Sequence, residues 1–245
     1  MLRRWELNEP TRVMTLLIGM ILNTFILHSA YLRFFVTLGS YISTIVTTPS
    51  FSSLFLVNKM IADLLSNGNF WITSTLFISL LGAIIFRMDR DIGYANLIYS
   101  LPYRKWEIIG IKYIVLFLYS LMLTFIPFFS VAILSNLSIA EHLPGILFSR
   151  LTMLKMLLTL YIILYMTTLV TLVSLLSPST LMAFVASISL LFLPFFIHIS
   201  EVPPLIFLES SVKEVFTPKC TIWGVIVPLA LLTTSIITSE RRDVR

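Results

Sequence analysis

The sequence predicts an all-α polytopic membrane protein with six transmembrane helices, and three observations lead to this fold class. Of the 245 residues, 58% are hydrophobic and 12% are charged, whereas soluble domains carry about 25% charged residues. Six uncharged apolar runs each approach the ~20 residues that a helix needs to cross a bilayer. The basic residues between these runs are distributed unequally. A soluble globular protein is therefore excluded.

The six predicted spans follow directly from the apolar runs. They cover about 13–32, 70–86, 113–134, 156–176, 180–199 and 221–239. Lipid offers the backbone no hydrogen-bond partners, and the alternating pattern of a β-barrel is absent from these runs, so each is predicted to be helical. No hydrophilic stretch is long enough to form a second domain. Residues 1–245 are expected to form a single transmembrane domain.

The distribution of basic residues predicts the orientation. Six spans place both termini on one side of the membrane, together with the loop 87–112. That side holds eleven Lys and Arg residues and the opposite side holds six. Because cytoplasmic loops are enriched in Lys and Arg, both termini are predicted to be cytoplasmic.

Two outer connections are long and apolar. Within 33–69, the residues from Leu54 to Leu65 have helical spacing, which predicts an outer interfacial helix, with a buried segment of the bundle as the alternative. The last outer connection contains Pro203 and Pro204. It is expected to form either a re-entrant turn or a loop lying on the surface.

Several classes of chemistry lack the sequence features they require. The glycines form no phosphate-binding loop, and neither a zinc-protease nor a serine-hydrolase motif occurs. His28, His142 and His198 are far apart, and Cys220 is the only cysteine. No catalytic residue, metal ligand or cofactor site is therefore predicted, and no basic run suggests nucleic acid. Ionisable groups are nearly absent from the spans, which disfavours proton-coupled transport.

The loop between the second and third spans concentrates charge. Its residues Tyr94, Leu97, Ile98 and Leu101 recur at helical spacing and predict a short amphipathic helix that Pro102 ends. Such a helix either rests on lipid headgroups or docks on a cytoplasmic protein. The neighbouring charges are of both signs, which favours a protein partner over anionic lipid.

This loop resembles the corresponding loop of permease subunits of type-two ATP-binding-cassette exporters. The matching positions are Asp91, where the family commonly has Glu, then Gly93, Ser100, Leu101, Pro102, Arg104, Glu107, Ile108 and Lys112. Gly110 stands one place early relative to the usual Gly-Lys pair. The six spans and cytoplasmic ends extend the resemblance over the whole chain.

The resemblance implies a multi-pass permease subunit in the plasma membrane. It would form a homo- or heterodimer with a second permease and export a hydrophobic, amphipathic, lipidic or peptidic substrate. A separate cytoplasmic ATPase subunit would bind ATP and Mg²⁺ and dock on a coupling helix. The residues implied in this coupling are Asp91, Gly93, Tyr94, Leu97, Ile98, Leu101, Pro102, Arg104 and Glu107. The alternatives are an intramembrane enzyme, a solute carrier without an ATPase, or a non-transporting assembly or immunity protein.

Small residues in the fifth span suggest a place where helices approach closely. Ser179, Ala183 and Ser187 recur every four residues. Such a repeat allows two helix backbones to come together in a membrane. We expect it at the dimer interface, with packing inside one subunit as the alternative.

Overall fold

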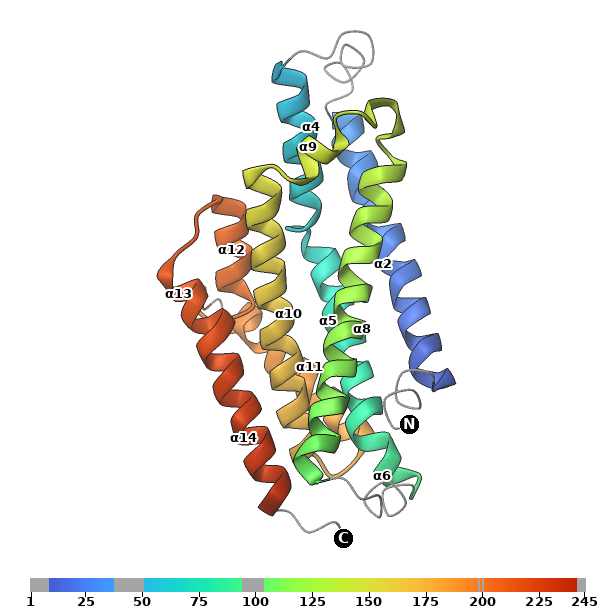
Figure 1. Cartoon of the computed structure of the whole chain (residues 1–245), viewed down its shortest axis with the longest axis vertical. Coiled ribbons are helices and arrows are strands. Elements are labelled where there is room, and N and C mark those ends of the chain that lie inside the picture. The colour runs from blue at the N-terminus through green and yellow to red at the C-terminus, as the bar shows by residue number, and fades with distance from the viewer. Residues whose placement is uncertain (1–8, 38–50, 94–103, 198, 200, 242–245) are drawn as a thin grey trace.

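The computed structural model describes residues 9–37, 51–93, 104–197, 199 and 201–241, and within these ranges it is a bundle of helices without strands (Figure 1). In chain order the elements are α2 (Pro10–Thr37), α4 (Phe51–Leu64), α5 (Gly68–Ala83), the π-helix η1 (Ile84–Met88), α6 (Asp89–Asp91), α8 (Lys105–Leu134), the 3-10 helix η2 (Leu137–Ile139), α9 (Leu143–Leu147), α10 (Arg150–Leu176), α11 (Thr180–Ile197), α12 (Leu205–Lys213), α13 (Pro218–Thr221), the π-helix η3 (Ile222–Ile226) and α14 (Val227–Arg241).

Within the described part of the chain, six helical segments are long and apolar enough to cross a membrane. They are Pro10–Val36, Leu54–Met88, Lys105–Leu134, Arg150–Leu176, Thr180–Ile197 and Pro218–Ser239. Each predicted span lies within one of these segments apart from the final residues of the fifth. The all-helical class and the six membrane-spanning helices are therefore confirmed.

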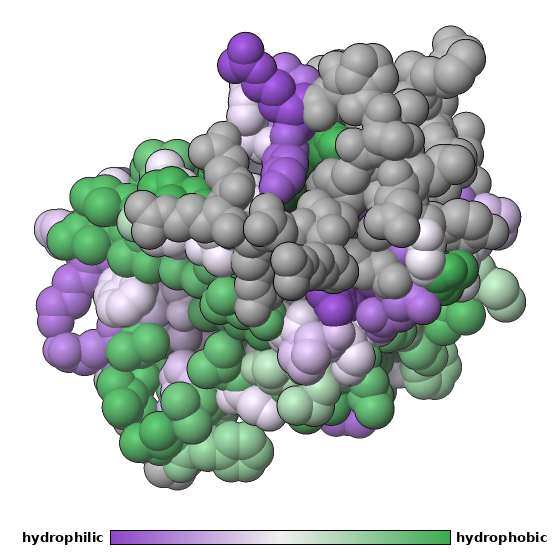
Figure 2. Space-filling model, turned by 90° about the horizontal axis from the view of Figure 1, so that it is seen from below, coloured by the Kyte–Doolittle hydropathy of each residue, from purple (hydrophilic) through white to green (hydrophobic). Residues whose placement is uncertain are grey.

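Both ends of the described chain lie at the same end of the bundle. Figure 1 shows that α2 begins and α14 ends there, close to α6. Figure 2 views the molecule from this end, where groups of hydrophilic residues lie among larger hydrophobic areas. We call it the loop end, because the connection between the second and third spans also lies there.

α10 occupies the centre of the bundle. It packs against α5, α8, α11, α12 and α14. Its buried residues include Thr167 and Thr171, whose hydroxyl groups donate to main-chain carbonyl groups one turn earlier in the same helix. By contrast α2, α11 and α14 are peripheral and expose apolar side chains such as Phe25, Leu181 and Leu229.

The second span is broken at 65–67, between α4 and α5, in the half of the bundle away from the loop end (Figure 1). The side chain of Asn67 caps α5 by accepting a hydrogen bond from the Phe70 amide at 3.1 Å. Trp71 donates its indole N–H to the Leu65 carbonyl at 2.7 Å. These two side chains satisfy backbone groups that the break leaves without intrahelical partners.

The predicted outer interfacial helix is instead part of the bundle. α4 packs against α2, α9 and α10, and its residues Ile61 and Leu64 are fully buried. Its charged residue Asp63 pairs with Lys155 of α10, whose side chain is 1% exposed. This pairing explains why a segment carrying charge lies inside the bundle, as the alternative interpretation held. α12 also packs along α10, through the buried residues Ile206 and Phe207.

A buried amide joins three spans near the middle of the bundle. The Asn23 side chain of α2 donates to the Ser74 hydroxyl of α5 and to the Leu123 carbonyl of α8, both at 3.0 Å. A polar side chain inside a membrane bundle is stabilised by such interhelical bonds. Asn23 therefore has a packing role here.

Candidate functional site

The candidate site lies where the second and third spans enter the loop between them. The structure describes the two ends of this loop, up to Gly93 and again from Arg104. Five of the predicted coupling residues lie outside the described residues: Tyr94, Leu97, Ile98, Leu101 and Pro102. The described part of the site comprises the two ends of the loop and the helices that contact them.

Asp89 is the centre of a buried charge cluster at the start of the loop. Its side chain is 8% exposed. Lys112 of α8 forms an ion pair with one carboxylate oxygen, and Arg12 of α2 lies 3.3 Å from the other. The Lys112 ammonium also donates to the Ile85 carbonyl at 2.7 Å. One carboxylate thus joins the first, second and third spans.

Glu9 is the fourth member of this charge cluster. Arg12 is fully buried and also forms an ion pair with Glu9, one turn earlier in the chain. The two acidic and two basic groups therefore balance in formal charge. Burying unpaired ions is costly, and such a cluster forms only where opposite charges and hydrogen bonds compensate. Asp89 and Arg12 are held together although 77 positions separate them in the sequence.

A second contact joins the loop to the turn between α10 and α11. Asp91 accepts hydrogen bonds from the Thr180 amide at 2.7 Å and from the Thr180 hydroxyl at 2.5 Å. Arg87 lies 3.4 Å from Asp91 and donates to the Pro178 carbonyl. The end of the second span is therefore bound to the start of the fifth.

The contact with Thr180 and Arg87 lowers the pKa of Asp91. Partial burial acts to raise the pKa of its carboxyl group. The hydrogen bonds from Thr180 and the charge of Arg87 outweigh burial, so the pKa lies below its usual value. Asp91 is therefore ionised at neutral pH and binds Thr180 as a carboxylate.

The two described loop ends have defined backbone geometry. Gly93 follows α6 with a φ of +87°, in the left-handed region that favours glycine, and a β-carbon added there would meet no described atom within 4 Å. At the other end, Glu107 accepts a hydrogen bond from the Arg104 amide at 3.1 Å and so caps the start of α8. Three predicted residues thus have local structural roles in shaping the loop ends.

Small residues of α11 are covered within the chain. Ala183 and Ser187 are fully buried, and α11 packs against α5 and α10. Ser179 is half-buried and caps α11 by accepting a hydrogen bond from the Met182 amide at 3.3 Å. Ala183 and Ser187 therefore pack inside the chain, and the dimer interface at α11 stays a prediction.

The central residues of the charge cluster were missed in the sequence. Arg12 counted only as a basic residue on the predicted cytoplasmic side, Lys112 counted there and as a position matching the family's loop, and Asp89 had no assigned role. The available signal was their position, because each lies at or near an end of a predicted span. A charge at that depth needs a partner, but the sequence does not show which charges meet.

The arrangement is suited to mechanical connection. Within the described residues, no group of three or more His, Cys, Asp or Glu side chains is placed to hold a metal ion. The charged groups of the site are bound to one another and to main-chain atoms. Through these bonds, the start of the loop is connected to the first, third and fifth spans.

Comparisons with known proteins add no family assignment. No protein-family model, no curated protein and no solved structure matches the chain.

Proposed function

We propose that this chain is the membrane-spanning permease subunit of an ATP-driven exporter of the type-two ATP-binding-cassette class. A separate cytoplasmic subunit would hydrolyse ATP, and the loop after the second span would receive its motion. The observation that supports this function is the attachment of the start of that loop to three other spans, through Asp89 and Asp91.

A transmission element needs a stiff connection to the parts that it moves. A loop joined only by its chain ends would bend when a partner pushed on it. Here the carboxylate of Asp89 connects to α2 and α8, while that of Asp91 connects to α11. A displacement of the loop would therefore act on these spans together.

The proposed docking element is the segment 93–102. The predicted apolar stripe of Tyr94, Leu97, Ile98 and Leu101 would insert into a cleft on the ATPase, and Pro102 would end the helix. Arg104 and Glu107 would lie at the rim of the contact. In this proposal Asp91 and Gly93 set the direction in which the segment leaves the second span.

The proposed orientation places the loop end in the cytoplasm of a cell bounded by the plasma membrane. Single cysteines at Trp106 and Leu137 test it, since these residues are 42% and 62% exposed and lie near opposite ends of the bundle. The native Cys220 is fully buried, which keeps background labelling low. An impermeant thiol reagent applied to intact cells should label the cysteine at 137 and spare the one at 106. The reverse pattern would show the opposite orientation.

The docking proposal is tested with Leu97→Asp. Burying an aliphatic side chain contributes about 1.5–3 kcal/mol. Replacing one with a charge should therefore weaken ATPase binding by about tenfold to a hundredfold or more. The measurements are co-purification of an ATPase subunit in mild detergent and ATP hydrolysis by the reconstituted complex.

The matched control is Leu137→Asp, which places the same charge on an exposed leucine near the opposite end of the bundle. It should leave ATPase binding unchanged. If Leu97→Asp kept full ATPase binding and hydrolysis, the loop would rest on lipid headgroups instead. If the wild-type chain captured no ATPase, a non-transporting membrane protein or an ATPase-independent carrier would be favoured.

A further inference from the structure

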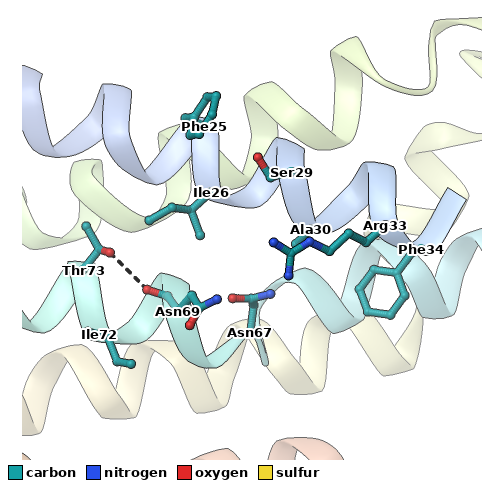
Figure 3. Close-up of a pocket in the computed structure, with 10 residues that line it drawn as sticks. All are labelled: Phe25, Ile26, Ser29, Ala30, Arg33, Phe34, Asn67, Asn69, Ile72 and Thr73. Atoms are coloured by element: carbon teal, nitrogen blue, oxygen red, sulfur yellow. Dashed lines mark hydrogen bonds between the residues drawn. The ribbon is translucent and has the colours of Figure 1, made fainter. Parts of the chain in front are cut away.

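A groove of about 600 Å³ lies between α2 and the start of α5 (Figure 3). It is near the break in the second span, in the half of the bundle away from the loop end. Its volume falls within the ~300–1,000 Å³ typical of sites for small ligands. None of the proposed coupling residues lines it.

The groove is apolar along one part and polar along another. Phe25 and Ile26 of α2 and Ile72 of α5 form the apolar part, and Phe25 and Ile72 are 70% and 45% exposed. Arg33 and Asn69 form the polar part with Asn67. Figure 3 shows the guanidinium group of Arg33 directed toward the two asparagine side chains.

The polar part carries hydrogen-bond donors and positive charge. A guanidinium group has five N–H donors, so Arg33 can bind an anion in addition to other contacts. The carbonyl oxygen of Asn67 accepts from the Phe70 amide, which leaves its amide nitrogen as a donor. α5 begins at Gly68, and the amides of its first turn add positive potential beside the groove.

The depth of the groove matches the boundary between headgroups and acyl chains. Arg33 lies about 35 Å along the axis of α2 from Pro10, its first residue, at the helical rise of ~1.5 Å per residue. Since the hydrocarbon core is ~30 Å thick, Arg33 reaches the headgroup region when α2 begins near the opposite surface. Phe25 lies about 12 Å deeper by the same rise.

We propose that this groove binds one anionic lipid of the bilayer. The phosphate would contact the Arg33 guanidinium and the amide groups of Asn67 and Asn69, because guanidinium groups bind phosphate oxygens in pairs. One acyl chain would lie along Phe25 and Ile72. A soluble anion would leave this apolar part unfilled. The proposal does not depend on the chain being a transporter.

Native mass spectrometry of the full chain in mild detergent tests the proposal. The probes are phosphatidylglycerol, phosphatidylcholine with the same acyl chains, and glycerol phosphate. Phosphatidylglycerol should be retained most strongly, because the choline group cancels the phosphate charge and glycerol phosphate lacks a chain. Arg33→Gln should weaken binding of phosphatidylglycerol by about tenfold, the loss expected for one charge-assisted hydrogen bond.

Two further variants complete the test. Lys59→Gln removes an exposed positive charge from α4, outside the groove, and should leave retention unchanged. Ser29→Phe fills the groove from α2 and should reduce retention of phosphatidylglycerol to the Arg33→Gln level or below. A thermal melt in detergent verifies that each variant is folded. Equal retention by wild type and Arg33→Gln would overturn the proposal, as would glycerol phosphate binding as tightly as phosphatidylglycerol.

Discussion

Replacing Asp89 by Asn should strongly destabilise the bundle. The substitution keeps the size of the side chain and removes the one carboxylate that Arg12 and Lys112 share. Each charge-assisted hydrogen bond contributes about 1.5–3 kcal/mol. Removing one partner of a buried ion pair typically costs about 3–5 kcal/mol, because the remaining charge stays buried without compensation. We therefore expect the free energy of unfolding to fall by about 3–5 kcal/mol.

A titration with sodium dodecyl sulfate in mixed micelles, followed by far-ultraviolet circular dichroism, measures this free energy. The double variant Asp89→Asn with Lys112→Met should recover part of the loss, because it removes one of the two cations that lose the Asp89 carboxylate. The coupling energy of the double-mutant cycle isolates that pair. Glu209→Gln is the matched control, since its ion pair with Lys213 is exposed and should contribute little. A loss below about 1 kcal/mol for Asp89→Asn would refute the assignment of a buried charge cluster.

Two further predictions concern the contacts of the second span. Gly82→Ala should lower the free energy of unfolding by about 1–3 kcal/mol, because the added methyl group meets the Val170 side chain. In a Val170→Ala background the same titration should show a smaller loss. An unchanged loss in that background would contradict close α5–α10 contact. Thr180→Val should raise the pKa of Asp91 toward its usual value, as read from its carboxyl carbon shift by NMR. Because the pKa of Asp91 is lowered, the wild-type contact is fully stabilising above the usual carboxyl pKa and weakens as the pH falls through the lowered value. An unshifted pKa of Asp91 in Thr180→Val would argue against the hydrogen bond from the Thr180 hydroxyl.

The spans could be predicted from the sequence because the length of an apolar run is a local property. A run such as 156–176 has to cover the hydrocarbon core whatever its neighbours are. The helix around it extends further, from Arg150, because its first turns are stabilised by contacts that composition does not reveal. Ser149 caps it and bonds to Asn58 of α4 at 2.9 Å. The position at which a helix begins therefore depends on contacts between segments, which the sequence does not show.

The interior position of α4 could not be predicted for the same reason. Its apolar residues recur at helical spacing in an outer connection, which suggested a helix at the interface. Only the fold shows that Lys155 neutralises Asp63 from a helix 92 positions further along the chain. The short-range cap of α8 by Glu107 lies three residues from Arg104 and is of the kind that sequence can reveal.

The second span has an acidic residue toward each of its ends, and each is bound by cations from other spans. Asp63 pairs with Lys155 near one end, and Asp89 pairs with Arg12 and Lys112 at the other. Between these points the helix departs from α geometry twice, at the break at 65–67 and in the π-helix next to Asp89.

π-turns and helix breaks already lack the regular backbone hydrogen bonds of an α-helix. The second span can therefore bend at these two places with the least further loss of such bonds. Asp63 lies just before the break and Asp89 lies just after the π-helix. Their ion pairs therefore fix the chain on the outer side of each irregularity. Force applied to the loop at Asp91 would therefore reach α2 and α8 through Asp89 before it deformed α5. If the loop does receive the motion of an ATPase, the first and third spans are the helices expected to move with it.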